Sequence, residues 1–156
     1  MTEPSPARIV ADSDVLAADL LAGGAARACL DHVRRHAWVT LVASDALLDD
    51  AEAVIDRLGD SELAADWRER IEELREPVAQ PAGDHPALAS AYHGGAMHVL
   101  SFDERLTSTK GNTTVRGRVE TAVRTPDAFA RLFDPEKLYP AVVGGEYPGP
   151  DRDPRA

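Results

Sequence analysis

The sequence has 156 residues, 44% of them hydrophobic and 28% charged, which suffices for one globular domain with a buried core. No apolar run approaches the roughly 20 residues of a transmembrane helix and no signal-peptide pattern opens the chain, so we expect a soluble, cytoplasmic protein without a membrane partner. The single cysteine, Cys29, excludes a disulfide framework and a multi-cysteine zinc site, and the net charge of −10 would normally oppose binding to nucleic acid.

Strands and helices alternate along the chain. We predict a leader over residues 1–7, one domain over 8–143 and a flexible C-terminal tail over 144–156. Apolar runs predict strands at 7–11, 38–42 and 97–101, and helical periodicity predicts helices at 15–21, 25–36, 45–58, 61–76, 86–93 and 125–133. Alternating valines suggest a short strand or hairpin within 115–123. This order predicts an α/β protein, a three-layer α/β/α sandwich with a mostly parallel central sheet.

Acidic residues directly follow two of the predicted strands. Asp12, with Asp14 two residues on, follows the first strand, and Asp103 follows the strand that ends at Ser101. In open parallel sheets, ligands bind beyond the carboxyl ends of the strands, so these carboxylates would meet in one crevice. A group of three or four acids suits Mg²⁺ or Mn²⁺. The alternative is that each Asp only caps the helix that follows it.

Helix 45–58 carries further acidic residues. At 100° per residue, Asp49 points away from the apolar stripe and is expected to be a surface charge, whereas Asp50 and Glu52 flank the stripe on opposite sides. Periodicity alone does not choose between Asp50 and Glu52 as a site residue. Asp84, just before the helix that leads into strand 97–101, is a fourth candidate, and its alternative is again a helix cap.

Four segments together resemble the PIN-domain nucleases. Ile9-Val10-Ala11-Asp12-Ser13-Asp14-Val15-Leu16 looks like the opening strand and acid of that family. Ser44-Asp45-Ala46-Leu47-Leu48-Asp49-Asp50 is similar to its Ser-x-x-apolar-apolar-x-Glu helix start, with Asp50 in place of the usual Glu. The stretch from Asp84-His85-Pro86 to Ser101-Phe102-Asp103 looks like its third and fourth acids, and Thr125-Pro126-Asp127-Ala128-Phe129 resembles the start of its last helix. The resemblance covers about residues 8–133.

This resemblance implies a metal-dependent endoribonuclease that hydrolyses RNA phosphodiester bonds. A carboxylate-bound Mg²⁺ or Mn²⁺ would lower the pKa of a bound water and stabilise charge on the leaving oxygen. The resemblance also implies that homodimers are common, and it leaves open whether the protein is a toxin with an antitoxin partner. The implied catalytic and metal-binding residues are Asp12, Asp50, Asp84 and Asp103, with Asp14, Ser44 and Ser101 in support.

A basic segment follows the fourth acid. Residues 105–124 hold five basic side chains and one acidic one, a net charge of +4, and Arg105, Lys110, Arg116 and Arg118 are the expected RNA contacts. The alternative is a surface loop whose arginines pair with nearby acids. The chain as a whole has 16 Asp, 11 Glu, 15 Arg, 26 Ala and only 2 Lys, a composition typical of extreme halophiles, although an acidic mesophilic protein is the alternative. At molar salt the Debye length falls to about 3 Å, so net charge does not exclude RNA.

Two other functions compete with the nuclease hypothesis. Asp50 is shorter than the Glu usual at its position, which would permit a catalytically reduced PIN-like module that binds RNA or a protein without cutting. An α/β phosphotransfer receiver also has an acidic pocket at its strand ends. It would need a phospho-acceptor Asp after its third strand and a Lys after its fifth, which Lys110 and Lys137 fit poorly.

Overall fold

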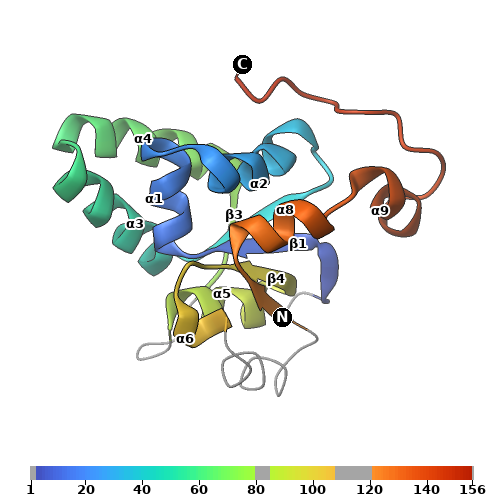
Figure 1. Cartoon of the computed structure of the whole chain (residues 1–156), viewed down its shortest axis with the longest axis horizontal. Helices are drawn as coiled ribbons and strands as arrows, with labels where there is room; N and C mark the ends of the chain where they lie inside the picture. Colours follow the sequence, from blue (N-terminus) through green and yellow to red (C-terminus); the bar gives the residue numbers. More distant parts are fainter. Residues whose placement is uncertain (1–2, 80–84, 108–120, 156) are drawn as a thin grey trace.

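The computed structural model describes residues 3–79, 85–107 and 121–155 (Figure 1). Within those residues the chain forms a five-stranded, entirely parallel sheet in the order β3-β2-β1-β4-β5. The strands are β1 (Ser5–Ala11), β2 (Thr40–Ala43), β3 (Arg75–Pro77), β4 (Ala96–Leu100) and β5 (Ala122–Arg124). The helices are α1 (Ser13–Leu21), α2 (Gly24–Arg35), α3 (Asp45–Leu58), α4 (Ser61–Leu74), α5 (Pro86–Gly94), α6 (Glu104–Thr107), α8 (Pro126–Leu132) and α9 (Pro135–Val142).

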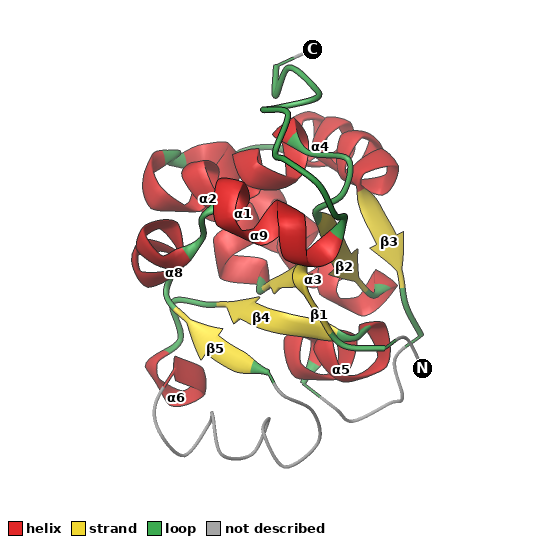
Figure 2. Cartoon of the chain, turned by 90° about the vertical axis from the view of Figure 1, so that its right-hand side faces the viewer, coloured by secondary structure: helices red, strands yellow, loops and turns green. Residues whose placement is uncertain are grey.

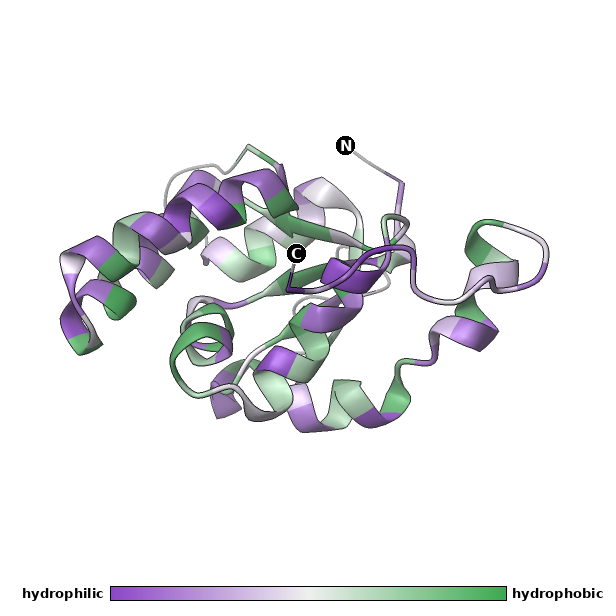
Figure 3. Cartoon of the chain, turned by 90° about the horizontal axis from the view of Figure 1, so that it is seen from above, coloured by the Kyte–Doolittle hydropathy of each residue, from purple (hydrophilic) through white to green (hydrophobic). Residues whose placement is uncertain are grey.

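The helices cover both faces of the sheet, so the predicted three-layer α/β/α sandwich is confirmed. Helices α1, α2, α4 and α8 lie on one side, and α5 and α6 lie on the other (Figures 1 and 2). Because both faces are covered, the central strands are apolar toward their carboxyl ends, with Ile9, Val10, Leu41 and Val42 fully buried. Figure 3 shows green apolar strands inside and helices that alternate between green and purple around them. Within the described residues, no helix has the length and apolar character needed to cross a bilayer.

Local sequence signals set the ends of several helices. The Ser44 hydroxyl accepts a hydrogen bond from the Leu47 N–H and so caps α3, as the sequence predicts. At the end of α5, Gly95 has a φ of +67°, a left-handed conformation that glycine adopts without strain. A Cβ on the preceding Gly94 would lie 2.2 Å from Val42 Cγ1, so glycine is also what lets α5 pack closely on β2.

Several predicted boundaries require correction. Strand β1 begins at Ser5, inside the predicted leader 1–7. The helix predicted over 61–76 ends at Leu74, and Arg75–Pro77 instead forms the edge strand β3. That strand is polar and only three residues long, so it shows no apolar pattern in the sequence. Its Arg75 donates to the Ala43 carbonyl and pairs with Asp45 and Glu72, which holds the edge in place.

The C-terminal segment packs on α2, unlike the flexible tail predicted over 144–156. The Tyr147 hydroxyl lies 2.6 Å from Nε2 of the buried His36, whose Nδ1 lies 2.8 Å from the His32 carbonyl oxygen. Farther on, Arg152 donates to the Val33 carbonyl and Arg155 pairs with Asp31. These polar contacts lack apolar periodicity, which is why the sequence pattern did not indicate them. They lie at the end of α2 that leads into the amino end of β2.

Candidate active site at the carboxyl ends of β1 and β4

The site lies where the order of the strands reverses. The chain runs outward from β1 through β2 to β3, then crosses to β4 on the other side of β1. The Asp12 N–H donates to the Leu100 carbonyl over 2.8 Å, which continues the pairing of Ala11 with Leu100 and brings the residues after both strands together. A reversal of this kind leaves a crevice beyond the carboxyl ends of the two strands, the usual position of ligands in open α/β sheets.

Ser101 connects the first and the last predicted acids. Its buried hydroxyl donates to Asp12 Oδ2 over 2.9 Å and accepts the Asp103 N–H over 3.0 Å. Asp12 is itself buried, and its Oδ1 accepts the Ser13 N–H at the start of α1. Asp12 therefore caps α1, and the same carboxylate is linked through the Ser101 hydroxyl to the backbone of Asp103.

Asp14 lies close to both of these acids, and we call Asp12, Asp14 and Asp103 together the acidic cluster. Its Oδ2 accepts the Phe102 N–H over 3.1 Å, whereas its Oδ1 is buried and has no hydrogen-bond partner in the described structure. Burial raises the pKa of Asp14 to about 6, and the negative charges of Asp12 and Asp103 add to this effect. The site thus concentrates more negative charge than its own hydrogen bonds compensate.

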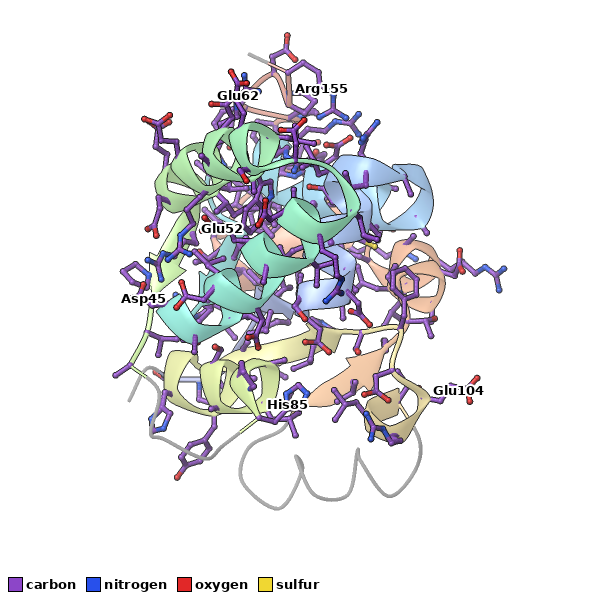
Figure 4. All side chains as sticks on the ribbon, turned by 90° about the vertical axis from the view of Figure 1, so that its left-hand side faces the viewer. Asp45, Glu52, Glu62, His85, Glu104 and Arg155 are labelled. Atoms are coloured by element: carbon purple, nitrogen blue, oxygen red, sulfur yellow. The ribbon has the colours of Figure 1, made fainter. Side chains whose placement is uncertain are left out.

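Asp103 forms an ion pair with Arg105. Its carboxylate accepts the Arg105 backbone N–H over 2.9 Å and pairs with the guanidinium at 3.1 Å. The hydrogen bonds from Arg105 lower the pKa of Asp103, and the charge of His85 lowers it further. His85 caps α5 through Nδ1, which accepts the Ala87 N–H, and Figure 4 shows it at the start of that helix. Helix α5 therefore also faces the cluster.

Helix α3 presents its acids on different sides. Asp50 is exposed on the second turn. Asp49, exposed as predicted, and Glu52 both pair with Arg68 of α4, so the flank that carries Glu52 faces α4 (Figure 4 labels Glu52). Asp50 lies on the opposite flank, which favours it over Glu52 as the acid available to a ligand. The role of Asp50 stays a prediction.

The remaining candidates divide into two groups. Ser44 is buried at the end of β2, where its hydroxyl caps α3. Four others fall outside the described residues: Asp84, Lys110, Arg116 and Arg118. Among the residues that the structure does describe, no three Asp, Glu, His or Cys side chains are already arranged around one position for a metal ion.

Two features of the site escaped the sequence analysis. One is that Asp14 accepts a hydrogen bond from the backbone of Phe102, just after β4. This contact depends on the β1–β4 register and not on any local motif. The other is that His85 approaches Asp103, although 18 residues separate them in the chain. The Asp12-x-Asp14 spacing was the only available signal for the first, and the proximity of α5 to β4 gives no sequence signal for the second.

Comparison with known protein families assigns the chain to one family. A family model described as a family of unknown function (DUF7384) matches residues 3–155, nearly the whole sequence. The chain belongs to the DUF7384 family. No curated protein and no solved structure matches it. Since the family match begins just before β1 and ends at Arg155, which pairs with Asp31 of α2, the DUF7384 family unit includes both the acidic cluster and the C-terminal contacts.

Proposed function

We propose that this protein is a metal-dependent endoribonuclease of PIN type that hydrolyses RNA phosphodiester bonds in the cytoplasm. The observation that carries the proposal is the convergence of Asp12, Asp14 and Asp103 at the strand-order reversal, where burial, and next the charges of Asp12 and Asp103, raise the pKa of Asp14. The resemblance of the surrounding segments to PIN-domain nucleases supports the same conclusion. An antitoxin or a second copy of the chain as partner stays a prediction of that resemblance.

The donor set fits Mg²⁺ or Mn²⁺. All three side chains offer hard carboxylate oxygens, and the buried, unpartnered Oδ1 of Asp14 is an acceptor that a cation would satisfy. Mg²⁺ keeps several of its waters and commonly binds proteins through only one or two carboxylates. A preformed set of three ligands is therefore not required, and Asp50 and Asp84 remain predicted metal ligands.

The residues of the chain have separable roles in the proposed reaction. Ser101 orients Asp12 through its hydroxyl and fixes the backbone of Asp103, so two acids are held by one side chain. A bound metal supplies an activated water and charge stabilisation on the leaving oxygen. Asp103 would exchange its pairing with Arg105 for the metal, and the Arg105 guanidinium, 90% exposed, would then contact a substrate phosphate.

A second candidate is a PIN-like module that binds RNA or a protein without cutting. The Asp103–Arg105 ion pair favours this candidate, because the guanidinium of Arg105 competes with a metal ion for the Asp103 carboxylate. A nuclease and an RNA-binding module would both bind RNA, and they differ in whether the phosphodiester bond breaks. Cleavage therefore separates them.

The test is degradation of single-stranded RNA with Mn²⁺ in molar KCl by three proteins. Wild type should cut, and Asp103→Asn should not. Asparagine caps a helix about as well as aspartate, so this variant keeps the start of α6 and loses only the charge. Asp66→Asn, an exposed acid on α4, is the matched control and should cut like wild type. A wild type that binds RNA but leaves it intact supports the binding module, and an active Asp103→Asn refutes the site as described.

A further inference from the structure

An exposed aromatic residue, Phe102, lies in the chain directly beside the acidic cluster. Phe102 is 45% exposed and lies two residues after the end of β4, between the buried Ser101 and the partly buried Asp103. The next three residues in the chain, Asp103, Glu104 and Arg105, are all charged. A single aromatic ring among charges is a poor centre for a protein interface, which depends on a larger, desolvated apolar core.

The backbone that carries this ring is fixed from both sides. Asp14 Oδ2 accepts the Phe102 N–H, and Ser101 Oγ accepts the N–H of Asp103, the next residue. The first of these two groups belongs to the acidic cluster, and the second donates a hydrogen bond to it. The backbone of Phe102 is therefore held beside the carboxylates, so this segment does not have to become ordered when a ligand covers the ring.

We propose that Phe102 is a stacking platform for an unpaired nucleobase of the RNA whose phosphodiester bond lies at the acidic cluster. Every base has a π face, so stacking on an aromatic side chain tolerates any sequence but requires that the base is not already stacked within a duplex. The substrate class is therefore single-stranded RNA, or the loops and ends of folded RNA. This inference rests on the proposed function, which places the phosphate beside Asp103.

The experiment measures the affinity of a short, labelled single-stranded RNA by fluorescence anisotropy, with Ca²⁺ as the divalent cation. A second oligonucleotide has the same phosphates but abasic positions. Phe102→Leu keeps an apolar side chain and removes the ring, and Phe102→Tyr keeps the ring. Melting curves confirm that both variants fold.

Loss of the ring should weaken binding of the base-containing RNA by about 5- to 150-fold, the range that corresponds to about 1–3 kcal/mol for one stacked base. Phe102→Tyr should bind this RNA like wild type, and all three proteins should bind the abasic oligonucleotide equally. Equal affinity of Phe102→Leu and wild type for RNA would overturn the proposal, as would an equal loss on both oligonucleotides.

Cleavage separates failure of the stacking proposal from failure of the nuclease proposal. If wild type cuts the abasic oligonucleotide with Mn²⁺ while Phe102→Leu binds RNA normally, only the stacking platform is refuted. If wild type neither binds nor cuts either oligonucleotide, the proposed function is refuted and the stacking platform with it.

Discussion

Replacing Asp14 by Asn is expected to stabilise the metal-free protein at neutral pH. The pKa of Asp14 is raised from an ordinary 3.8 to about 6, because burial and two neighbouring acids disfavour its charge. Below pH 4 the carboxyl is protonated in the folded and the unfolded chain, so it costs nothing. Between pH 4 and 6 only the unfolded chain releases the proton, so the free energy of unfolding falls as the pH rises, and above pH 6 the cost is constant.

The expected size of the effect follows from the shift. A shift from 3.8 to about 6 corresponds to about 3 kcal/mol at about 1.4 kcal/mol per pKa unit, but Asp14 is only partly buried, so solvent screening reduces this to about 1–2 kcal/mol. Asparagine carries no charge, and its amide oxygen can still accept the Phe102 N–H. The variant should therefore melt roughly 2–8 °C above wild type at pH 7, and this difference should vanish near pH 4.

Mn²⁺ should reverse the order of stability. A ligand that binds only the folded state adds about 2.7 kcal/mol at a hundredfold excess over its Kd, and Asp14→Asn should lose most of this gain. The assay is thermal unfolding from pH 4 to 7.5, with and without Mn²⁺, with Asp66→Asn as the control for loss of a surface charge. An Asp14→Asn protein that is less stable than wild type at pH 7 without metal, or one with an undiminished response to Mn²⁺, would refute the reasoning.

Three further predictions concern stability away from the cluster. The melting temperature should rise from dilute buffer to molar KCl, because screening relieves repulsion within a chain of net charge −10, and equal values would count against the halophilic interpretation. Gly94→Ala should cost about 1–3 kcal/mol in urea unfolding, since its Cβ would collide with Val42, and an unchanged midpoint would show that α5 can shift. Tyr147→Phe should cost about 1 kcal/mol through loss of the hydrogen bond to buried His36, and no change would mean that this hydrogen bond adds no stability.

The sequence allowed the central fold to be predicted because its signals there are strong. Buried parallel strands favour apolar runs, and β1, β2 and β4 each end in one, at 9–11, 41–43 and 99–100. Helix α3 begins where Ser44 predicts. The parts that were missed are stabilised by polar contacts over long distances in the chain: β3 through Arg75, and the C-terminal segment through Tyr147 and Arg155. Such contacts leave no periodic pattern.

The position of the acidic cluster could be predicted from the sequence, but the burial and the charge partners of each acid could not. Parallel strands bring their carboxyl ends to one edge, which is enough to pair Asp12 with Asp103. The weight of each acid depends instead on burial and partners. Burial raises the pKa of Asp14, whose Oδ1 has no hydrogen-bond partner in the described structure. Hydrogen bonds from Arg105, two residues on, lower the pKa of Asp103. No spacing rule distinguishes these two environments.

The most direct test of the central claim is a crystal structure grown with Mn²⁺ and measured for anomalous scattering. The acidic cluster predicts one strong anomalous peak about 2 Å from carboxylate oxygens drawn from Asp12, Asp14 and Asp103, with the Arg105 guanidinium turned away from Asp103. Crystals in millimolar Mn²⁺ that show peaks only elsewhere on the surface, with the Asp103–Arg105 pair intact, would contradict a metal centre at the reversal between β1 and β4.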